Sequence, residues 1–360
     1  MKDKITILAI NPGSTSTKIA VYSNGQTVYL RNIKHSTEEI NKFEFITDQY
    51  EFRKNIILNE LKDADININF IDAIVGRGGL VKPIESGIYE VNEEMKKDLF
   101  VGILGKHASN LGGLIADDIA KSLPNTKAYI ADPVVVDEFC ELARVSGHPE
   151  FERKSIFHAL NQKAIAKQYA KSTMKKYEDL NLIVAHLGGG ISVGAHKKGR
   201  VIDVNQALNG EGPFSPERSG TLPVGDLVEM CFSKKYTKTE IKKMITGKGG
   251  FVAYFGTNDA YKIEQKAIDE NDKKAKFYYD AMAFQIAKEI GAMSTVLKGE
   301  VDGILITGGL AHSKLLVNEI MKRVYKIAPI FIYPGEDEMR ALATNGLMVI
   351  KGEIKPKIYL

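Results

Sequence analysis

The stretch "ILAINPGSTSTKIAVYSNGQTVYL" (residues 7–30) combines an apolar strand, a bend of small polar residues and a hairpin. Its first apolar run is interrupted by Asn11, Pro12 and Gly13, which are followed by a run of hydroxyl residues and Lys18. Apolar alternation then resumes until Asn24-Gly25, a pair that favours a tight hairpin because both turn positions need positive φ. We therefore predict strands over 4–11, 17–23 and 26–33.

The same pattern returns in the second half of the chain. "NLIVAHLGGGISVGAHKKGRVIDVN" (181–205) predicts a strand, a bend of small residues, a strand, a turn at Lys198-Gly199 and a third strand. A second echo pairs "DAIVGRGG" (72–79) with "DGILITGG" (302–309). We interpret both echoes as an internal duplication, in which each half is a mixed α/β sheet flanked by helices.

Segments outside the two echoes complete the predicted α/β pattern. Apolar residues at helical spacing predict helices over 37–63, 108–124 and 157–177. Apolar runs next to turn residues predict strands over 68–79 and 127–136.

Composition limits the class of protein. A chain of 360 residues predicts two domains, and its net charge of +4 with 26% charged residues gives no sign of nucleic-acid binding. The lysine-rich stretches 233–243 and 271–277 are interpreted as solvated helix faces. Two cysteines without a metal-binding spacing, no long apolar run and no signal-like N-terminus predict a cytoplasmic protein that does not bind membranes.

The polar bend after the first strand is a candidate phosphate site. Small residues let backbone N–H groups approach an anion, while hydroxyls and a lysine add donors and charge. The second bend, "HLGGGIS" (186–192), offers three glycines at the matching place. The alternative is a Ser/Thr-rich surface turn. Neither a P-loop nor a Rossmann fingerprint nor the protein-kinase motifs are present in the sequence.

Eight motifs in order along the chain resemble the acetate kinase family, and within it most closely the shorter butyrate kinases. They are "NPGSTSTK", "VGRGG", "KHASNLGG", "FHALNQ", "AHLGGGIS", "ERSGTLPVGDL", "ITGGLAHS" and "PGEDEMRALA". The resemblance implies an α/β fold of two duplicated ribonuclease-H-like (actin-like ATPase) domains with an interdomain nucleotide cleft. The N-terminal domain would comprise 1–155 plus 341–360, and the C-terminal domain 156–340 would hold the adenosine-binding segment.

The same resemblance assigns roles to individual residues. Arg77, Asp132, His158 and Arg218 match catalytic positions, with Arg77, His107 and Arg218 on the substrate. ATP or ADP would be held by Asn11, Ser14, Ser16, Lys18, His186, Gly188, Gly189, Gly190, Gly308 and Gly309. Mg²⁺ would be held by Asp132 and Glu338 with Asn11. Acetate kinases carry Asn-Gly where this chain has Gly189-Gly190, so backbone groups would replace one side-chain contact to phosphate.

The implied reaction transfers a phosphoryl group from ATP to a small carboxylate and gives an acyl phosphate and ADP. Butanoate is the first candidate for that carboxylate. A carboxylate is ionised at neutral pH, so the site needs cations and metal ligands rather than a general base. Each assigned residue also has a structural alternative: a surface arginine or ion pair for Arg77 and Arg218, a satisfied histidine for His107 and His158, a turn cap for Asp132, and a helix start for Glu338.

The motifs are also compatible with other functions. An acetate, propionate or isobutyrate kinase would carry the same motifs. A non-catalytic actin-like ATP-binding protein would not need both arginines and His158. A sugar kinase would need an aspartate base, for which Asp132 is the candidate. The resemblance also implies a homo-oligomer, a dimer or larger.

Overall fold

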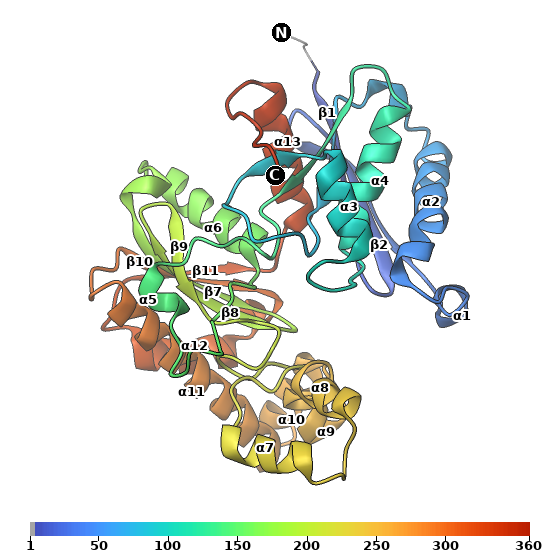
Figure 1. Cartoon of the computed structure of the whole chain (residues 1–360). Helices are drawn as coiled ribbons and strands as arrows, with labels where there is room; N and C mark the ends of the chain where they lie inside the picture. The colour runs from blue at the N-terminus through green and yellow to red at the C-terminus, as the bar shows by residue number, and fades with distance from the viewer. Residues whose placement is uncertain (1–3) are drawn as a thin grey trace. The chain divides into compact units, whose positions relative to one another are not determined.

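The computed structural model describes residues 4–360, and these form two compact units (Figure 1). Unit 1 comprises the described chain up to Val136 together with Asp337–Leu360, and unit 2 comprises Asp137–Glu336. The domain limits expected from the sequence, 155/156 and 340/341, lie further along the chain than these unit limits and stay a prediction.

Unit 1 is built on a six-stranded mixed sheet with the order β3-β2-β1-β4-β6-β5. The strands are β1 (Thr6–Pro12), β2 (Ser16–Ser23), β3 (Gln26–Lys34), β4 (Ala73–Arg77), β5 (Ile88–Glu90) and β6 (Lys127–Ala131). Strands β1, β4 and β6 run parallel, whereas β2, β3 and β5 are antiparallel to their neighbours. The parallel strands therefore end at one edge of the sheet.

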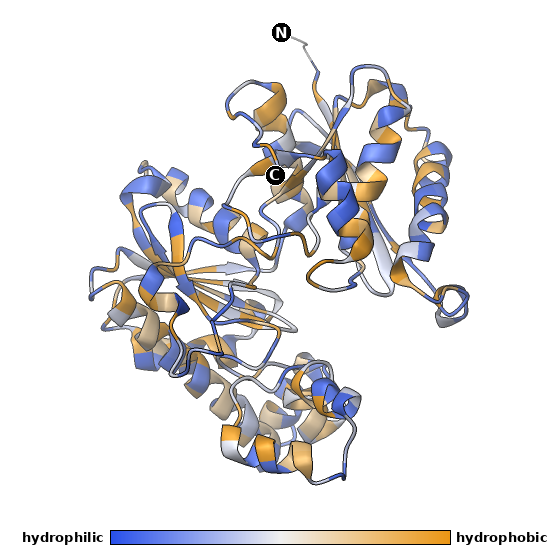
Figure 2. Cartoon of the chain, viewed as in Figure 1, coloured by the Kyte–Doolittle hydropathy of each residue, from blue (hydrophilic) through white to orange (hydrophobic). Residues whose placement is uncertain are grey.

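Helices cover the unit 1 sheet and close its core. The helical segments are α1 (Thr37–Ile40), η1 (Ile46–Gln49), α2 (Tyr50–Asp63), η2 (Ile68–Phe70), α3 (Glu93–Val101), α4 (Asn110–Lys121) and α13 (Glu338–Ile350). Figure 2 shows apolar residues gathered on the strands and on α4, whose inner residues belong to the buried core. A Cβ at Gly76 in β4 would lie 2.2 Å from the carbonyl oxygen of Gly112, so glycine lets α4 approach the sheet this closely.

Unit 2 is built on a five-stranded mixed sheet with the order β11-β10-β7-β8-β9. The strands are β7 (Asn181–Leu187), β8 (Ile191–Lys197), β9 (Arg200–Val204), β10 (Gly303–Gly308) and β11 (Ile330–Pro334). Strands β7, β10 and β11 are parallel, and β7-β8-β9 form an antiparallel meander. Apart from β5, this is the strand order of unit 1.

The helices of unit 2 fall into two groups. Those that pack on the sheet are α6 (Ala159–Ser172), α11 (Lys273–Val296) and, against α11, α12 (Lys314–Val324). The chain also contains α5 (Glu141–Arg144), η3 (Tyr177–Asp179), α7 (Val224–Phe232), α8 (Lys238–Ile245), α9 (Gly250–Phe255), α10 (Ala260–Ile268) and η4 (Gly309–His312). Helices α7 to α10 lie between β9 and α11 in the sequence, where the echoes predicted no element.

Equivalent contacts in the two units bear out the duplication. In unit 1 the backbone N–H of Thr6 donates to Oδ2 of Asp72 at 2.8 Å, and in unit 2 that of Asn181 donates to Oδ2 of Asp302 at 2.7 Å. Both meanders shift register two pairs beyond the hairpin turn. The two turns also match, with φ of 49° and 82° at Asn24-Gly25 and 49° and 85° at Lys198-Gly199. Positive φ at both turn positions is what the predicted hairpin requires.

Some predicted segments differ from the structure. The stretch 37–63 is interrupted between α1 and η1, and 68–79 contains a 3-10 turn before the strand starts at Ala73. Strand β6 ends at Ala131 rather than at residue 136, because Asp132 has a φ of 38° and Pro133 cannot donate a ladder hydrogen bond. Among residues 4–360, no helix combines the length and apolar composition that a membrane crossing requires.

Candidate active site

Predicted site residues gather where the parallel strands of unit 1 end. Asn11 lies next to the last residue of β1, Arg77 is the last residue of β4, and Asp132 follows β6 directly. The register aligns β1 with β4 and β4 with β6 over these ends. In open α/β sheets ligands bind at the carboxyl ends of parallel strands, so this edge is the expected place for a site.

Asn11, Arg77 and Glu338 form a contact cluster at this edge. Nδ2 of Asn11 donates to Oε2 of Glu338 at 2.6 Å, and the guanidinium of Arg77 lies 3.2 Å from Oε1 of Glu338. Arg77 also donates to Oδ1 of Asn11 at 3.3 Å. Glu338 begins α13, so its carboxylate accepts charge-assisted bonds at a helix start. The cluster joins an arginine, a carboxylate and an amide at a partly exposed position.

The first bend lies beside this cluster. Lys18 is directly opposite Asn11 in the β1–β2 ladder, so the two side chains are on the same face of the sheet. Ser14 is exposed and Ser16 is half-buried in the connection. The N–H of Gly13 donates to the carbonyl of Ser16 at 2.7 Å, which closes the bend. The exposed hydroxyls and Lys18 are thus available to an anion.

A buried arginine that the sequence analysis did not single out shapes this bend. Arg53 on α2 is 0% exposed. Its guanidinium donates to the backbone carbonyls of Gly13, Ser14 and Ser16 at 2.8, 3.2 and 3.0 Å, and to Oγ1 of Thr17 at 3.0 Å. Burial lowers the pKa of Arg53 to about 10, so the group remains charged at neutral pH. Nothing in its helical surroundings distinguishes it from a surface arginine in sequence.

Asp132 and His107 have local partners in unit 1. Asp132 is 2% exposed, and its Oδ1 accepts from Oγ of Ser86 at 2.7 Å and from the N–H of Gly87 at 2.8 Å. These bonds match the alternative of a turn-capping aspartate. His107 is exposed before α4, and its Nδ1 lies 2.8 Å from Oγ of Ser109.

In unit 2 two predicted histidines stack on each other. The rings of His158, at the start of α6, and His186, near the end of β7, have centroids 3.9 Å apart and planes 14° apart. Nδ1 of His186 lies 2.8 Å from Oδ1 of Asn161, and its Nε2 lies 3.5 Å from Oε2 of Glu336. Nδ1 of His158 lies 2.8 Å from Oγ of Ser192. The structure therefore brings His158 to the second bend.

Arg218 lies against the same glycine bend. A Cβ at Gly190 would be 1.8 Å from a terminal guanidinium nitrogen of Arg218, so a larger residue there would displace the guanidinium. Arg218 donates to the carbonyl of Ala207 at 2.5 Å, while its buried Nε has no partner within residues 4–360. Burial lowers the pKa of Arg218, although Glu217 opposes this. Gly188 and Gly189 complete the bend, and Oγ of Ser215 donates to the carbonyl of Gly189 at 2.5 Å.

Gly308 and Gly309 lie at the end of β10. Gly308 has a φ of 93°, and a Cβ there would be 2.2 Å from the carbonyl oxygen of Leu187, so the strand end requires glycine. A Cβ at Gly309 would meet no atom within 4 Å. Gly309 therefore leaves open space at the carboxyl edge of this sheet, where a nucleoside could approach the backbone.

The oxygen atoms around Asn11 and Glu338 resemble a magnesium site more than a site in which protein side chains surround the metal completely. Among residues 4–360, no group of three or more His, Cys, Asp or Glu side chains could hold a metal ion. Mg²⁺ commonly keeps several waters and binds through one or two carboxylates and substrate phosphates. The carboxylate of Glu338 and the amide oxygen of Asn11 have the chemistry for that use. In the structure Glu338 pairs with Asn11 and Arg77, and the Asn11 oxygen accepts from Arg77. The Oδ1 of Asp132 accepts from Ser86 and Gly87.

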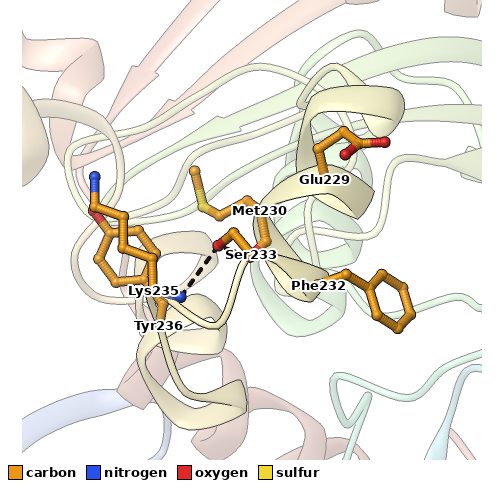
Figure 3. A pocket seen from close by; sticks show the side chains of 6 residues that line it. All are labelled: Glu229, Met230, Phe232, Ser233, Lys235 and Tyr236. Carbon is orange, nitrogen blue, oxygen red and sulfur yellow. Dashed lines mark hydrogen bonds between the residues drawn. The ribbon is translucent and has the colours of Figure 1, made fainter.

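Two surface pockets lie away from the predicted residues. One, of about 470 Å³, is at the end of α7 and is lined by Glu229, Met230, Phe232, Ser233, Lys235 and Tyr236 (Figure 3). The other, of about 620 Å³, lies among α7, α8, α9 and α11 and includes Ser219. Arg218 precedes Ser219, but its guanidinium contacts Gly190 and Ala207, which do not line this pocket.

Similarity to known proteins agrees with the fold and motifs. A family model described as the acetokinase family matches residues 150–349. The chain is 59% identical to butyrate kinase 2 of Clostridium acetobutylicum over 356 residues, covering 99% of both chains. It is 58% identical to butyrate kinase 1 of that organism, covering 98% of this chain and 99% of the relative. The chain belongs to the acetokinase family.

A solved acetokinase structure confirms the predicted fold class. The acetate kinase of Porphyromonas gingivalis matches with a TM-score of 0.77 at 19% identity, over 96% of this chain and 100% of that chain. The fold is thus the two-sheet α/β fold of acetate kinases, an actin-like ATPase fold. As a member of this kinase family, the chain uses ATP.

Proposed function

We propose that this chain is a butyrate kinase that transfers a phosphoryl group reversibly between ATP and butanoate, giving butanoyl phosphate and ADP. The observation that carries the proposal is identity of 58–59% to two butyrate kinases over nearly the full length. The site supports it, because two arginines and a histidine pair lie at glycine-rich and hydroxyl-rich bends. Arginine cations and histidine hydrogen-bond donors stabilise the charge of phosphoryl transfer, in which positioning and electrostatics supply most of the catalysis.

Unit 1 supplies groups for phosphate, metal and carboxylate. Ser14, Ser16 and Lys18 donate to ATP phosphates from the first bend, whose shape is held by Arg53. Glu338 and Asn11 hold Mg²⁺ together with those phosphates. When bound by these residues, the ion would supply positive charge that neutralises the phosphates. Arg77 binds the carboxylate or the transferred phosphoryl group, since its planar fork matches paired oxygens.

Asp132 and His107 have smaller parts in the proposal for unit 1. Asp132 orders the sheet edge through Ser86 and Gly87, and it contributes negative charge toward the metal. His107, an exposed residue, contacts the substrate.

Unit 2 supplies donors to the nucleotide and the transition state. Gly188, Gly189 and Gly190 present backbone groups to phosphate, with His186 at the base of the bend. Gly308 and Gly309 admit the adenosine. Arg218 and His158 donate to the oxygens of the transferred phosphoryl group. The unpartnered Nε of Arg218 supports this role, because a buried donor without a partner is costly unless a ligand satisfies it.

The test is an assay of the purified chain with Mg-ATP and a panel of acids and sugars. Hydroxylamine converts an acyl phosphate to a hydroxamate, which reports carboxylate phosphorylation separately from ATP consumption. We expect hydroxamate with butanoate in proportion to the ADP formed. ADP formation only with sugars would support a sugar kinase, and nucleotide binding without turnover would support a non-catalytic ATP-binding protein.

We further propose that the protein acts as a homo-oligomer, a dimer or larger, in the cytoplasm. Helix α7 supports self-association, because none of its residues is buried and its Val224 and Phe232 are 70% and 82% exposed. Exposed apolar surface of this kind is typical of protein interfaces. Sedimentation velocity of the purified chain tests the proposal, and a monomer at micromolar concentration would contradict it.

A further inference from the structure

Five polar side chains form a hydrogen-bonded series that ends at His158. Oη of Tyr177 lies 2.7 Å from Nδ1 of His196, whose Nε2 lies 2.9 Å from Oε1 of Gln162. Nε2 of Gln162 donates to Oγ of Ser192 at 2.8 Å, and that oxygen lies 2.8 Å from Nδ1 of His158. Gln162, Ser192 and His196 are each 0% exposed, so water does not compete for these bonds.

Strand β8 is built to receive the Gln162 carboxamide. Ser192, Gly194 and His196 alternate along β8 and therefore share one face of the sheet. A Cβ at Gly194 would lie only 2.6 Å from Oε1 of Gln162. Glycine between the two polar residues thus provides the space in which Gln162 reaches both of them.

A backbone carbonyl determines which way the carboxamide faces. Nε2 of Gln162 also donates to the carbonyl oxygen of Ser192 at 3.0 Å. A carbonyl only accepts, so the amide nitrogen must face Ser192 and the amide oxygen must face His196. The reverse orientation would set two acceptor oxygens against each other.

The orientation of Gln162 fixes the proton on His196. Because Oε1 of Gln162 accepts, Nε2 of His196 carries the hydrogen. Burial, with a smaller effect of Lys163, holds the pKa of His196 well below its usual range, so the ring is neutral. Its Nδ1 then accepts from the Tyr177 hydroxyl. The donor and the acceptor of each hydrogen bond between Tyr177 and Gln162 are thereby assigned.

The same orientation fixes the hydroxyl of Ser192. Its oxygen accepts from Gln162 and, at 3.4 Å, from the backbone N–H of His158. Within the described residues, Nδ1 of His158 is the remaining partner of this hydroxyl, which must then donate to it. A ring nitrogen that accepts has no hydrogen, so the neutral ring carries its hydrogen on Nε2.

We propose that Gln162 is a positioning residue, which directs the Ser192 hydroxyl onto Nδ1 of His158 and so keeps the His158 proton on Nε2. The consequence for catalysis rests on the proposed function: a protonated Nε2 is a donor for the transferred phosphoryl group. Without Gln162, the Ser192 oxygen can accept from Nδ1 instead, and the ring loses its preference for one tautomer.

The first test measures the tautomer directly in the full chain. Long-range ¹H–¹⁵N spectra of ¹⁵N-histidine-labelled protein distinguish protonated from bare ring nitrogens, and comparison with His158→Gln assigns the signals. We expect Nε2 of His158 to be protonated and Nδ1 to be bare at neutral pH. A proton on Nδ1 in the unmodified protein overturns the proposal, whatever the variants do.

The second test removes the positioning group. Gln162→Met keeps the shape and removes the donor, and Gly194→Ala displaces the same carboxamide by a different change. We expect the two ring ¹⁵N shifts of His158 to converge in both variants and kcat to fall roughly 10- to 100-fold, with a smaller change in the KM for ATP. Gln285→Met is the control, because Gln285 accepts from the N–H of Phe214 outside this series.

The outcomes separate the two levels of the inference. Unchanged His158 shifts in both folded variants overturn the positioning role of Gln162. Converged shifts with unchanged kcat support the positioning role but overturn the proposed donor role of His158. If Gln162→Met alone loses signal dispersion, that variant is unfolded. The positioning role is then judged from Gly194→Ala and from the His158 tautomer in the unmodified protein.

Discussion

Arg218 combines burial, charge and an unsatisfied donor. Its guanidinium packs on Gly190, bonds the carbonyl of Ala207 and leaves Nε without a partner in the part of the chain that the structure describes. We expect Arg218→Ala to lower kcat by about 10²–10³-fold, with a much smaller effect on ATP affinity, because loss of one transition-state donor costs roughly 2.7–4 kcal/mol. Steady-state kinetics and nucleotide titration measure the two effects separately.

Matched substitutions make the Arg218 test specific. Arg218→Lys keeps the charge but removes the planar fork, so we expect it to recover only part of the activity. Arg323→Ala is the control, because Arg323 pairs with Glu319 on the surface of α12 and should leave kcat unchanged. Near-normal turnover in Arg218→Ala would remove Arg218 from the mechanism.

His35 is a second residue with a measurable consequence. Burial, followed by the neighbouring Arg53, lowers the pKa of His35, and its buried Nδ1 has no partner within residues 4–360. In the unfolded chain a histidine takes up a proton at about pH 6.5, but folded His35 resists protonation at that pH. The unfolded state therefore binds more protons as the pH falls, and stability is lost below that pH.

The His35 prediction is tested by urea unfolding between pH 7 and pH 5.5. As the pH is lowered, we expect the free energy of unfolding to decrease more steeply in the unmodified protein than in His35→Gln. The difference in slope should approach, at most, about 1.4 kcal/mol per pH unit. Parallel curves for the two proteins would contradict a neutral, buried His35.

At the scale of elements, the first bend depends on a helix that is distant in sequence. Arg53 on α2 bonds three carbonyls of the bend, and Gln49 one turn earlier accepts from the same guanidinium at 2.8 and 3.0 Å. The sequence of the bend predicted contacts to phosphate, but the conformation of the bend is held by the Arg53 guanidinium. The periodicity of apolar residues predicts which helix positions are buried, but it does not predict that the charged Arg53 is one of them.

We expect Arg53→Lys to weaken ATP binding and to destabilise unit 1. A lysine provides one point charge in place of the fork, so several buried carbonyls lose their donor, at about 1–3 kcal/mol for each group left unsatisfied. Thermal unfolding and nucleotide titration measure the two effects. Lys54→Arg, at the neighbouring position whose partners are Glu51 and Asp118, is the control. Unchanged ATP affinity in a folded Arg53→Lys would contradict the role assigned to Arg53.

Other elements show where sequence reasoning succeeds. The duplicated meanders were predictable because alternating apolar residues and two positive-φ turns are local signals. The placement of Asn11, Arg77 and Glu338 together follows from strand order and from α13 returning to the first sheet, which the motifs alone do not show. Helices α7, α9 and α10 were missed, because they have no counterpart in the first half from which to infer them. The stretch 233–243, interpreted as a solvated helix face, overlaps α8. Gln162 was missed because its role depends on the gap at Gly194.

At the scale of the whole molecule, the proposed function must distinguish acids that differ only in their tails. Every short fatty acid presents the same carboxylate to the same cations, so selectivity comes from the pocket that holds the tail. One methylene in an apolar pocket is worth only about 1–3 kcal/mol, or roughly 10–200-fold. Specificity should therefore be graded rather than absolute.

We expect kcat/KM to be highest at or near butanoate, with propionate, valerate and isobutyrate measurably active. Acetate buries two fewer methylenes than butanoate, so its penalty compounds and its kcat/KM should be markedly lower. The measurement is kcat/KM for straight-chain acids of two to six carbons and for isobutyrate, at one fixed Mg-ATP concentration. A maximum at acetate would contradict the butyrate assignment in favour of an acetate kinase. A maximum at isobutyrate would keep the reaction and change the preferred acid, because the phosphoryl-transfer groups meet the same carboxylate in both cases.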